Sequence, residues 1–507
     1  MSSLEYSSAA WARGGLLAMR NVPEAALGDR VVVRDHQGRQ RSGQVIRSSA
    51  ELVLVQIFEG TDNLDLERTW VRFLDKPFEL ALAPEVLGRV FNGVGQPRDS
   101  RPPIVSKLSR NVNGASINPA ARAYPREFIQ TGISTIDGMN TLVRGQKLPV
   151  FSGSGLPHNR LAAQIVRQAK LLHAGKTESP NPSPPQPSPL VGRGQTLGQN
   201  RSPPQPSPLV GRGQTLGQNR LNDFALVFAA MGVSHSDARF FEESFEESGV
   251  LGQVATFINL ADDPPIERLI LPRVALTCAE YLAFDLGMHV LVVMTDMTYY
   301  AEALREIATG KGDVPARKGF PGYLYSDLAE IYERAGRIRG KAGSITLIPV
   351  VSMPSDDITH PVPDLTGYIT EGQIVLSREL AAANVQPPVA VLPSLSRLMK
   401  DGIGEGMTRE DHARVASQLF ASYAKAQEVR SLAAIIGAEE LSEEDNRYLQ
   451  FAEAFESRFV SQGEREDRTI FQTLDLAWEV LSLLPKEALT RLSEKDLDAR
   501  YQQPASE

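Results

Sequence analysis

Short apolar runs separated by turn residues dominate the first part of the chain. β-Branched and aromatic residues cluster at 31–33, 44–46, 52–57 and 70–73, with Gly, Asp and Ser between the clusters. This spacing is typical of a small all-β barrel, because each run suits one strand and each break suits a turn. The pattern therefore predicts an N-terminal β-barrel at residues 12–82.

The middle of the chain alternates strand-like apolar runs with helical segments. Strands are expected at 148–151, 224–230, 254–258, 289–295 and 344–351; helices are expected at 159–173, 236–247, 267–286 and 297–308. Repeated strand–helix units favour a mostly parallel, doubly wound sheet. We place this α/β domain at residues 83–395.

The remainder, residues 396–507, has helical periodicity. One apolar face is predicted from Val415, Leu419, Tyr423 and Leu432, and a second from Tyr448, Phe451, Phe455 and Phe459. Gly437 is a candidate C-terminal cap, and Ser442 with Asp445 forms a candidate N-terminal cap. These features predict a C-terminal helical bundle, in which the aromatic stripe is core.

One segment departs from this order. Residues 183–201 read SPPQPSPLVGRGQTLGQNR, and residues 202–220 repeat them without a change. Such a composition buries too little apolar surface to offset its ordering entropy, so disorder is expected for an insertion at 177–220. Lengthening a loop about eightfold costs only about 2 kcal/mol of closure entropy, so the fold can carry it.

Composition excludes several functional classes. The net charge of −8 argues against a nucleic-acid partner, which usually requires a basic excess. The single cysteine, Cys278, allows no intrachain disulfide and lies in an apolar run typical of a buried thiol. No run approaches the ~18 apolar residues of a membrane-spanning helix, and the N-terminus does not read as a signal peptide.

The segment 148–159, LPVFSGSGLPHN, resembles a degenerate phosphate loop. A working loop, G-x-x-x-x-G-K-[ST], uses backbone amides, a lysine and a hydroxyl to hold phosphates and Mg²⁺. Aligned on Gly155, the first glycine is Val150, the lysine is Leu156 and the hydroxyl is Pro157. The sequence is compatible with the loop shape, but not with its charge or its Mg²⁺ chemistry. Two interpretations of the nearby His158 and Arg160 stay open: phosphate contact, or capping and solvation of the helix start.

Two further positions bear on ATP chemistry. The apolar run 289–295 ends in Asp296, the pattern of a carboxylate that orders Mg²⁺, but without a lysine or hydroxyl beside it we interpret Asp296 as structural. Val233 follows the strand at 224–230, where catalytic relatives place a glutamate, and valine cannot orient water. Phosphate charge, metal ligand and base are therefore all missing, and no metal site is assigned.

Several long motifs, in order along nearly the whole chain outside ~177–220 and the termini, resemble the non-catalytic B-type subunits of V/A-type rotary ATPases. The motifs stand at 56–61, 87–93, 128–138, 151–159, 294–298, 320–328, 352–361 and 392–399. The resemblance implies a regulatory subunit that couples ATP synthesis or hydrolysis to transport of protons or sodium ions. It also implies a ring of alternating B-type and catalytic A-type subunits, three of each, around a rotating stalk.

The resemblance further implies which residues serve the shared ATP site. Arg397 is the arginine finger that reaches the γ-phosphate in the neighbouring subunit, where a guanidinium can raise the rate by roughly 10³–10⁵. Asp364 and Tyr368 line the shared pocket or, alternatively, only form a packed turn. ATP or ADP lies at the interface between subunits, and Mg²⁺ is held by the A-type partner. The candidate nucleotide-binding residues in the loop of this chain are Ser152, Gly153, Ser154, Gly155 and His158.

The implied partners are the A-type subunit, the central and peripheral stalks and, indirectly, the membrane sector, so the chain is expected on the cytoplasmic face of a membrane. Two alternatives stay open. A self-sufficient P-loop ATPase of the secretion or helicase type shares the barrel and the α/β domain, but requires the missing lysine and glutamate. A scaffold recruited through the proline-rich repeat would depend on residues 179–220.

Overall fold

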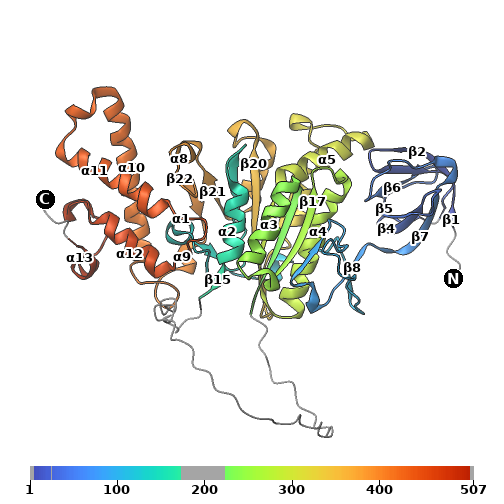
Figure 1. Cartoon of the computed structure of the whole chain (residues 1–507), viewed down its shortest axis with the longest axis horizontal. Coiled ribbons are helices and arrows are strands. Elements are labelled where there is room, and N and C mark those ends of the chain that lie inside the picture. The colour runs from blue at the N-terminus through green and yellow to red at the C-terminus, as the bar shows by residue number, and fades with distance from the viewer. Residues whose placement is uncertain (1–4, 24, 173–222, 503–507) are drawn as a thin grey trace, which may run out of the picture.

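The computed structural model describes residues 5–23, 25–172 and 223–502, and Figure 1 shows three regions in a row. A β-domain with the N-terminus lies at one end, an α/β region occupies the centre, and helices with the C-terminus lie at the other end. The segment 177–220, predicted to be a disordered insertion, lies outside the described residues. No helix in the described part of the chain is both long and apolar enough to cross a bilayer.

The N-terminal region is an antiparallel sheet of seven strands in the order β1-β7-β4-β5-β6-β3-β2. All four predicted runs form strands, and the inward side chains of these strands build a separate apolar cluster. The strands are β1 (Glu5–Tyr6), β2 (Ala9–Arg13), β3 (Leu16–Met19), β4 (Asp29–Arg34), β5 (Gln40–Ser48), β6 (Val53–Ile57) and β7 (Trp70–Pro77).

The central sheet has the order β22-β21-β14-β20-β18-β16-β17-β9, and only the β21–β22 pair in this path is antiparallel. Its strands are β9 (Arg89–Phe91), β14 (Val150–Gly153), β16 (Phe224–Val233), β17 (Val254–Leu260), β18 (His289–Thr295), β20 (Ser344–Met353), β21 (Gly372–Leu376) and β22 (Val389–Ser396). The mostly parallel sheet predicted from the strand–helix alternation is confirmed.

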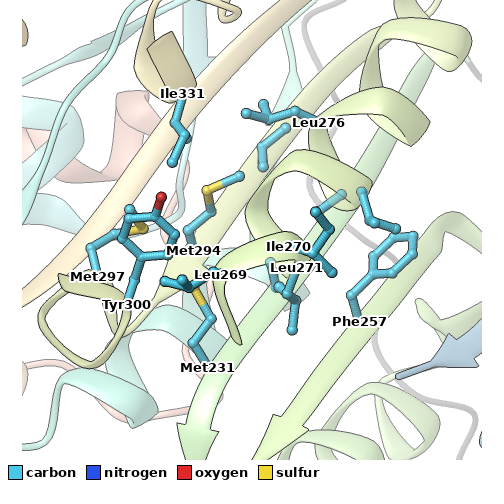
Figure 2. Close-up of a cluster of buried hydrophobic side chains, with 14 of the residues drawn as sticks. Met231, Phe257, Leu269, Ile270, Leu271, Leu276, Met294, Met297, Tyr300 and Ile331 are labelled. Carbon is cyan, nitrogen blue, oxygen red and sulfur yellow. The ribbon is translucent and has the colours of Figure 1, made fainter. Parts of the chain in front are cut away.

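Alternate residues of β16 show how helices cover both faces of this sheet. Ala225, Val227 and Ala229 belong to the core that contains α4 (Pro265–Glu280) and α5 (Met297–Lys311). Figure 2 shows part of that core, with Met231, Ile270 and Tyr300 among its side chains. Leu226, Phe228 and Ala230 belong to the opposite core, which contains α2 (His158–Gln168) and α3 (His235–Glu247). Because side chains alternate along a strand, both faces of a buried strand must be apolar.

Short elements complete the centre and connect it to its neighbours. They are β8 (Glu79–Ala81), β10 (Ser109–Asn111), β11 (Arg122–Ala123), β12 (Phe128–Gln130), α1 (Ser134–Met139), β13 (Leu142–Val143), β15 (Lys170–Leu171), α6 (Leu324–Tyr332), β19 (Gly336–Ile338), α7 (Pro361–Ile369), α8 (Arg378–Ala382) and α9 (Met399–Gly402).

The helix predicted at 159–173 was too long. It ends at Gln168, Ala169 is extended, and β15 follows at once. β15 pairs with β12, with Leu171 opposite Ile129 and Lys170 opposite Gln130. Pairing with a strand some 40 residues earlier overrides the local helical pattern, which carries no information about that partner.

The C-terminal region consists of α10 (His412–Ile436), α11 (Glu443–Ala454), α12 (Ile470–Leu481) and α13 (Glu494–Arg500). The predicted aromatic stripe is buried, Gly437 caps α10, and Ser442 and Asp445 form a reciprocal capping box. The prediction that Leu432 belongs to the buried face was wrong, because this residue is 41% exposed near the end of α10, beyond the buried cluster. Cys278 is buried as predicted.

Candidate functional site

The degenerate phosphate loop joins β14 to α2 at the carboxyl edge of the parallel sheet, where ligands of such sheets bind. Leu156 does not project from the loop as a lysine would. Its side chain is 8% exposed and belongs to the apolar core under the loop. The position that carries the phosphate-binding charge in a working loop is therefore a packing position in this chain.

The loop also uses some of its own amides internally. Leu156 N–H donates to the Gly153 carbonyl at 3.1 Å, and His158 N–H donates to the Leu156 carbonyl at 2.8 Å. Pro157 has no N–H to offer. Fewer donors are thus available to a phosphate than in a loop whose amides all point at the ligand.

Ser152 and His158 meet beneath the loop. The Ser152 hydroxyl is buried, lies 3.1 Å from His158 Nδ1 and donates to the Gly153 carbonyl at 3.2 Å. Arg160 is turned away, and its guanidinium pairs with Glu464 at 3.0 Å. The contact of Arg160 favours solvation of the helix start over phosphate binding.

Two residues that the sequence did not point to lie against this loop. Arg378, at the start of α8, donates to the Ser154 carbonyl at 2.9 Å and forms a bidentate ion pair with Asp356. A Cβ atom on Gly153 would lie 2.1 Å from Asp356 Oδ1, so any larger residue here would displace the Asp356 carboxylate. No spacing pattern signals this pair, because Asp356 follows β20 and Arg378 begins α8, and the two meet only in the folded chain.

Asp296 has a structural role, in agreement with its interpretation from the sequence. Its Oδ1 atom accepts the N–H groups of Thr298 at 2.8 Å and Ser352 at 3.1 Å, which caps α5 and joins it to β20. Its Oδ2 atom is buried without a hydrogen bond to any described residue. Val233, at the end of β16, is 4% exposed and pairs with Leu260, so this position offers only an apolar side chain.

Arg397 directly follows β22 at the edge of the sheet. Its backbone N–H donates to the Glu371 carbonyl at 3.0 Å. The residue is exposed, and its guanidinium makes no hydrogen bond or ion pair with any residue that the structure describes. No described residue thus neutralises the charge of Arg397.

The remaining predicted site residues lie on α7. Asp364 pairs with Arg317 at 3.2 Å, and Tyr368 is 73% exposed. The structure groups Ser152, Gly153, Ser154, Gly155 and His158 in one loop. Within the described residues, no hydrogen bond joins that loop to Asp364, Tyr368 or Arg397.

Known families match all three regions. Residues 13–75 match the β-barrel domain of the ATP synthase alpha/beta family, and residues 132–176 and 192–396 match its nucleotide-binding domain. Residues 401–501 match the C-terminal domain of V and A type ATP synthase. These matches confirm the predicted architecture of barrel, P-loop-type α/β domain and helical domain. Residues 177–191, within the predicted insertion, are left unmatched.

Individual relatives agree with the family match over their full length. The V-type ATP synthase beta chain of Nitrosococcus oceani is 66% identical over 99% of this chain and 95% of its own length. The V-type ATP synthase beta chain of Halothermothrix orenii is 53% identical over 99% and 98%. The solved ATP synthase protein NeqB of Nanoarcheaum equitans is 37% identical, with a TM-score of 0.67 over 93% of this chain and 100% of that one. The chain therefore belongs to the beta-chain (B-type) family of V- and A-type ATP synthases.

Proposed function

We propose that this chain is a non-catalytic subunit that alternates with a catalytic A-type subunit in a ring and completes the ATP site of that neighbour. Three positions support a non-catalytic role. Leu156 packs in the core, Pro157 provides neither hydroxyl nor N–H, and Val233 is an apolar group at the position of the base. A chain without these groups cannot neutralise phosphate, hold Mg²⁺ or orient water at its own loop.

The observation that carries this proposal is that the guanidinium of Arg397 has no partner among the residues that the structure describes. Arginine side chains near carboxylates usually pair with them, as Arg378 does with Asp356. Arg397 instead stands exposed with a fixed backbone, and its charge is uncommitted among the described residues. A guanidinium delivered in this way stabilises the charge that develops on a transferring phosphoryl group. No ion pair with a described residue has to break before it can do so.

The nucleotide and the partners follow from the same proposal. ATP or ADP lies at the shared interface, and Mg²⁺ is held by the partner. Asp364 and Tyr368 line the shared pocket, while Ser152, Gly153, Ser154, Gly155 and His158 face a nucleotide through neutral groups. The stalks and the membrane sector complete the complex, which places the chain at the cytoplasmic face of a membrane and couples ATP turnover to proton or sodium-ion transport.

The test is turnover by the ring reconstituted from this chain and an A-type partner. We expect Arg397→Ala and Arg397→Lys to lower ATP turnover by about 10³-fold or more while the ring still assembles, because lysine lacks the planar fork. Arg239→Ala is the matched control, since Arg239 is an exposed arginine that pairs with Glu243 on the surface of α3. Normal turnover by an assembled Arg397→Ala ring would contradict the proposal.

A further inference from the structure

Gln146, in the segment just before β14, contacts the two backbone segments next to Arg397: the end of β22 and the residue before β21. Gln146 is fully buried, and its Nε2 atom donates to the Ser396 hydroxyl and to the Glu371 carbonyl, each at 3.0 Å. Its Oε1 atom accepts Val143 N–H at 2.9 Å. All polar atoms of this side chain are thus engaged, and the amide can sit in only one orientation.

Both acceptors of Gln146 are directly linked to Arg397. Ser396 is the preceding residue, and its hydroxyl in turn donates to the Thr141 carbonyl at 2.8 Å. The Glu371 carbonyl also accepts the N–H of Arg397 itself. One amide group therefore fixes the end of β22 and the start of β21 relative to each other, at the point where the arginine leaves the sheet.

Lys147 holds Glu371 in place from the other side. Its side chain is 3% exposed, and its Nζ atom lies 2.8 Å from Glu371 Oε1 and 3.1 Å from Glu333 Oε1. Its backbone N–H donates to Glu371 Oε2 at 2.8 Å, and its carbonyl accepts Glu371 N–H at 3.0 Å. Two carboxylate partners hold this buried ammonium in position through charge-assisted hydrogen bonds. Glu371 is consequently a fixed anchor for the Arg397 backbone.

We infer that Gln146 is a positioning residue for Arg397, with Lys147 and Glu371 as its support; this inference rests on the proposed role of Arg397 in the ring. The guanidinium itself is held by none of the described residues, so its reach into the neighbour depends on the direction in which its backbone leaves the sheet. A displacement of about 1 Å in a reacting constellation can cost about 10²-fold in rate. Groups that hold such a constellation from behind therefore affect turnover without touching the substrate.

The test is Gln146→Leu in the ring reconstituted with an A-type partner. Leucine keeps most of the volume and removes both donors. We expect kcat to fall by about 10- to 100-fold with KM for MgATP unchanged, because Gln146 acts only through Arg397, whose guanidinium stabilises the transition state. The matched control is Gln418→Leu. Gln418 is also buried, donates to a hydroxyl (Ser422) and a carbonyl (Ala488), and accepts one N–H (Arg491), but lies in the C-terminal helices.

A milder variant keeps the test valid if Gln146→Leu does not fold. Ser396→Ala removes only the hydroxyl that Gln146 holds, and we expect it to lower kcat in the same direction by a smaller factor. Ser394→Ala is its control, because the Ser394 residue is similarly buried and its hydroxyl bonds to Ala390 and Val375 instead. Wild-type turnover by assembled rings of both Gln146→Leu and Ser396→Ala would overturn the inference.

A binding measurement separates positioning from a general structural effect. We expect Gln146→Leu to weaken binding of ADP–aluminium fluoride, which mimics the transferring phosphoryl group, and to leave binding of ADP–beryllium fluoride unchanged. In an Arg397→Ala background, the same substitution should change neither. Equal weakening of both complexes, or the same loss without Arg397, would overturn the inference. Normal turnover by Arg397→Ala together with a slow Gln146→Leu ring would instead refute the proposed role of Arg397.

Discussion

Arg378 and Asp356 form a two-point ion pair against the backbone of the degenerate loop. Arg378 Nε lies 2.8 Å from Asp356 Oδ2, and one terminal nitrogen lies 2.9 Å from Asp356 Oδ1 and 2.9 Å from the Ser154 carbonyl. The Asp356 carboxylate therefore occupies the space beside Gly153. Both side chains are about half exposed, so the ion pair adds little to the free energy of unfolding. Its main effect is to fix the positions of the two side chains beside the loop.

This arrangement predicts that Gly153→Ala destabilises the fold by about 1–3 kcal/mol, because the new methyl group would overlap Asp356. In an Asp356→Ala background the same substitution should cost much less, which a double-mutant cycle of urea unfolding would measure. Gly155→Ala is the control. Its φ of +81° imposes a cost of about 1–2 kcal/mol, but no atom lies within 4 Å of the new Cβ, so Asp356→Ala should not change that cost. Additive effects of Gly153→Ala and Asp356→Ala would contradict the contact.

Nucleotide chemistry of the isolated chain is a second prediction. We expect no ATP hydrolysis, and calorimetric titration should give the same weak affinity for ATP with and without Mg²⁺, because the loop has neither lysine nor hydroxyl. The double substitution Leu156→Lys with Pro157→Thr should introduce Mg²⁺-dependent binding, with thermal unfolding as the check on folding. Robust hydrolysis by the unmodified chain would revive the alternative of a self-sufficient P-loop ATPase.

The acid response should depend on His412, which joins α10 to α1. His412 Nε2 donates to the Gly138 carbonyl at 3.0 Å, and Nδ1 lies 3.0 Å from the Thr408 hydroxyl. Burial lowers the pKa of His412 to about 4. His412 therefore binds a proton near pH 6.5 in the unfolded chain but only near pH 4 in the native chain. The free energy of unfolding should fall between pH 6.5 and 4, by up to about 3 kcal/mol from this group.

Urea unfolding at a series of pH values tests this effect. His412→Gln should flatten the fall between pH 6.5 and 4, whereas the exposed control His36→Gln should keep it. An NMR titration that shows the His412 ring protonating near pH 6.5 in the native chain would refute the assignment.

Removal of the repeat is a fourth prediction. We expect deletion of residues 179–220 to leave ring assembly and turnover unchanged, because a shorter connection between β15 and β16 lowers the entropic cost of closing that loop, by about 1.5 kcal/mol. Size-exclusion chromatography and ATPase assays of the ring with the A-type partner would measure this. Loss of assembly would support the alternative of a scaffold that binds through the repeat.

The sequence alone determined most of the elements and the chemical deficits. The order of strand-like and helix-like segments along 224–351 predicted the parallel sheet, because apolar runs and helical spacing can be read from neighbouring residues. The lack of a lysine at Leu156 and of a hydroxyl at Pro157 was equally visible in the sequence, since folding cannot supply a side chain that the sequence does not contain. Arg397, by contrast, was indicated only by the resemblance to a family, because one exposed arginine carries no local pattern.

Only the tertiary structure decided which groups surround those positions. Gln146 meets Glu371 and Ser396 across 225 and 250 residues, and Lys170–Leu171 joins the strand at Phe128–Gln130 in place of a helix. The pairing of Arg378 with Asp356 likewise depends on the start of α8 meeting the turn after β20. Hydrogen bonds of this kind are set by the path of the chain, and local propensity carries no information about them.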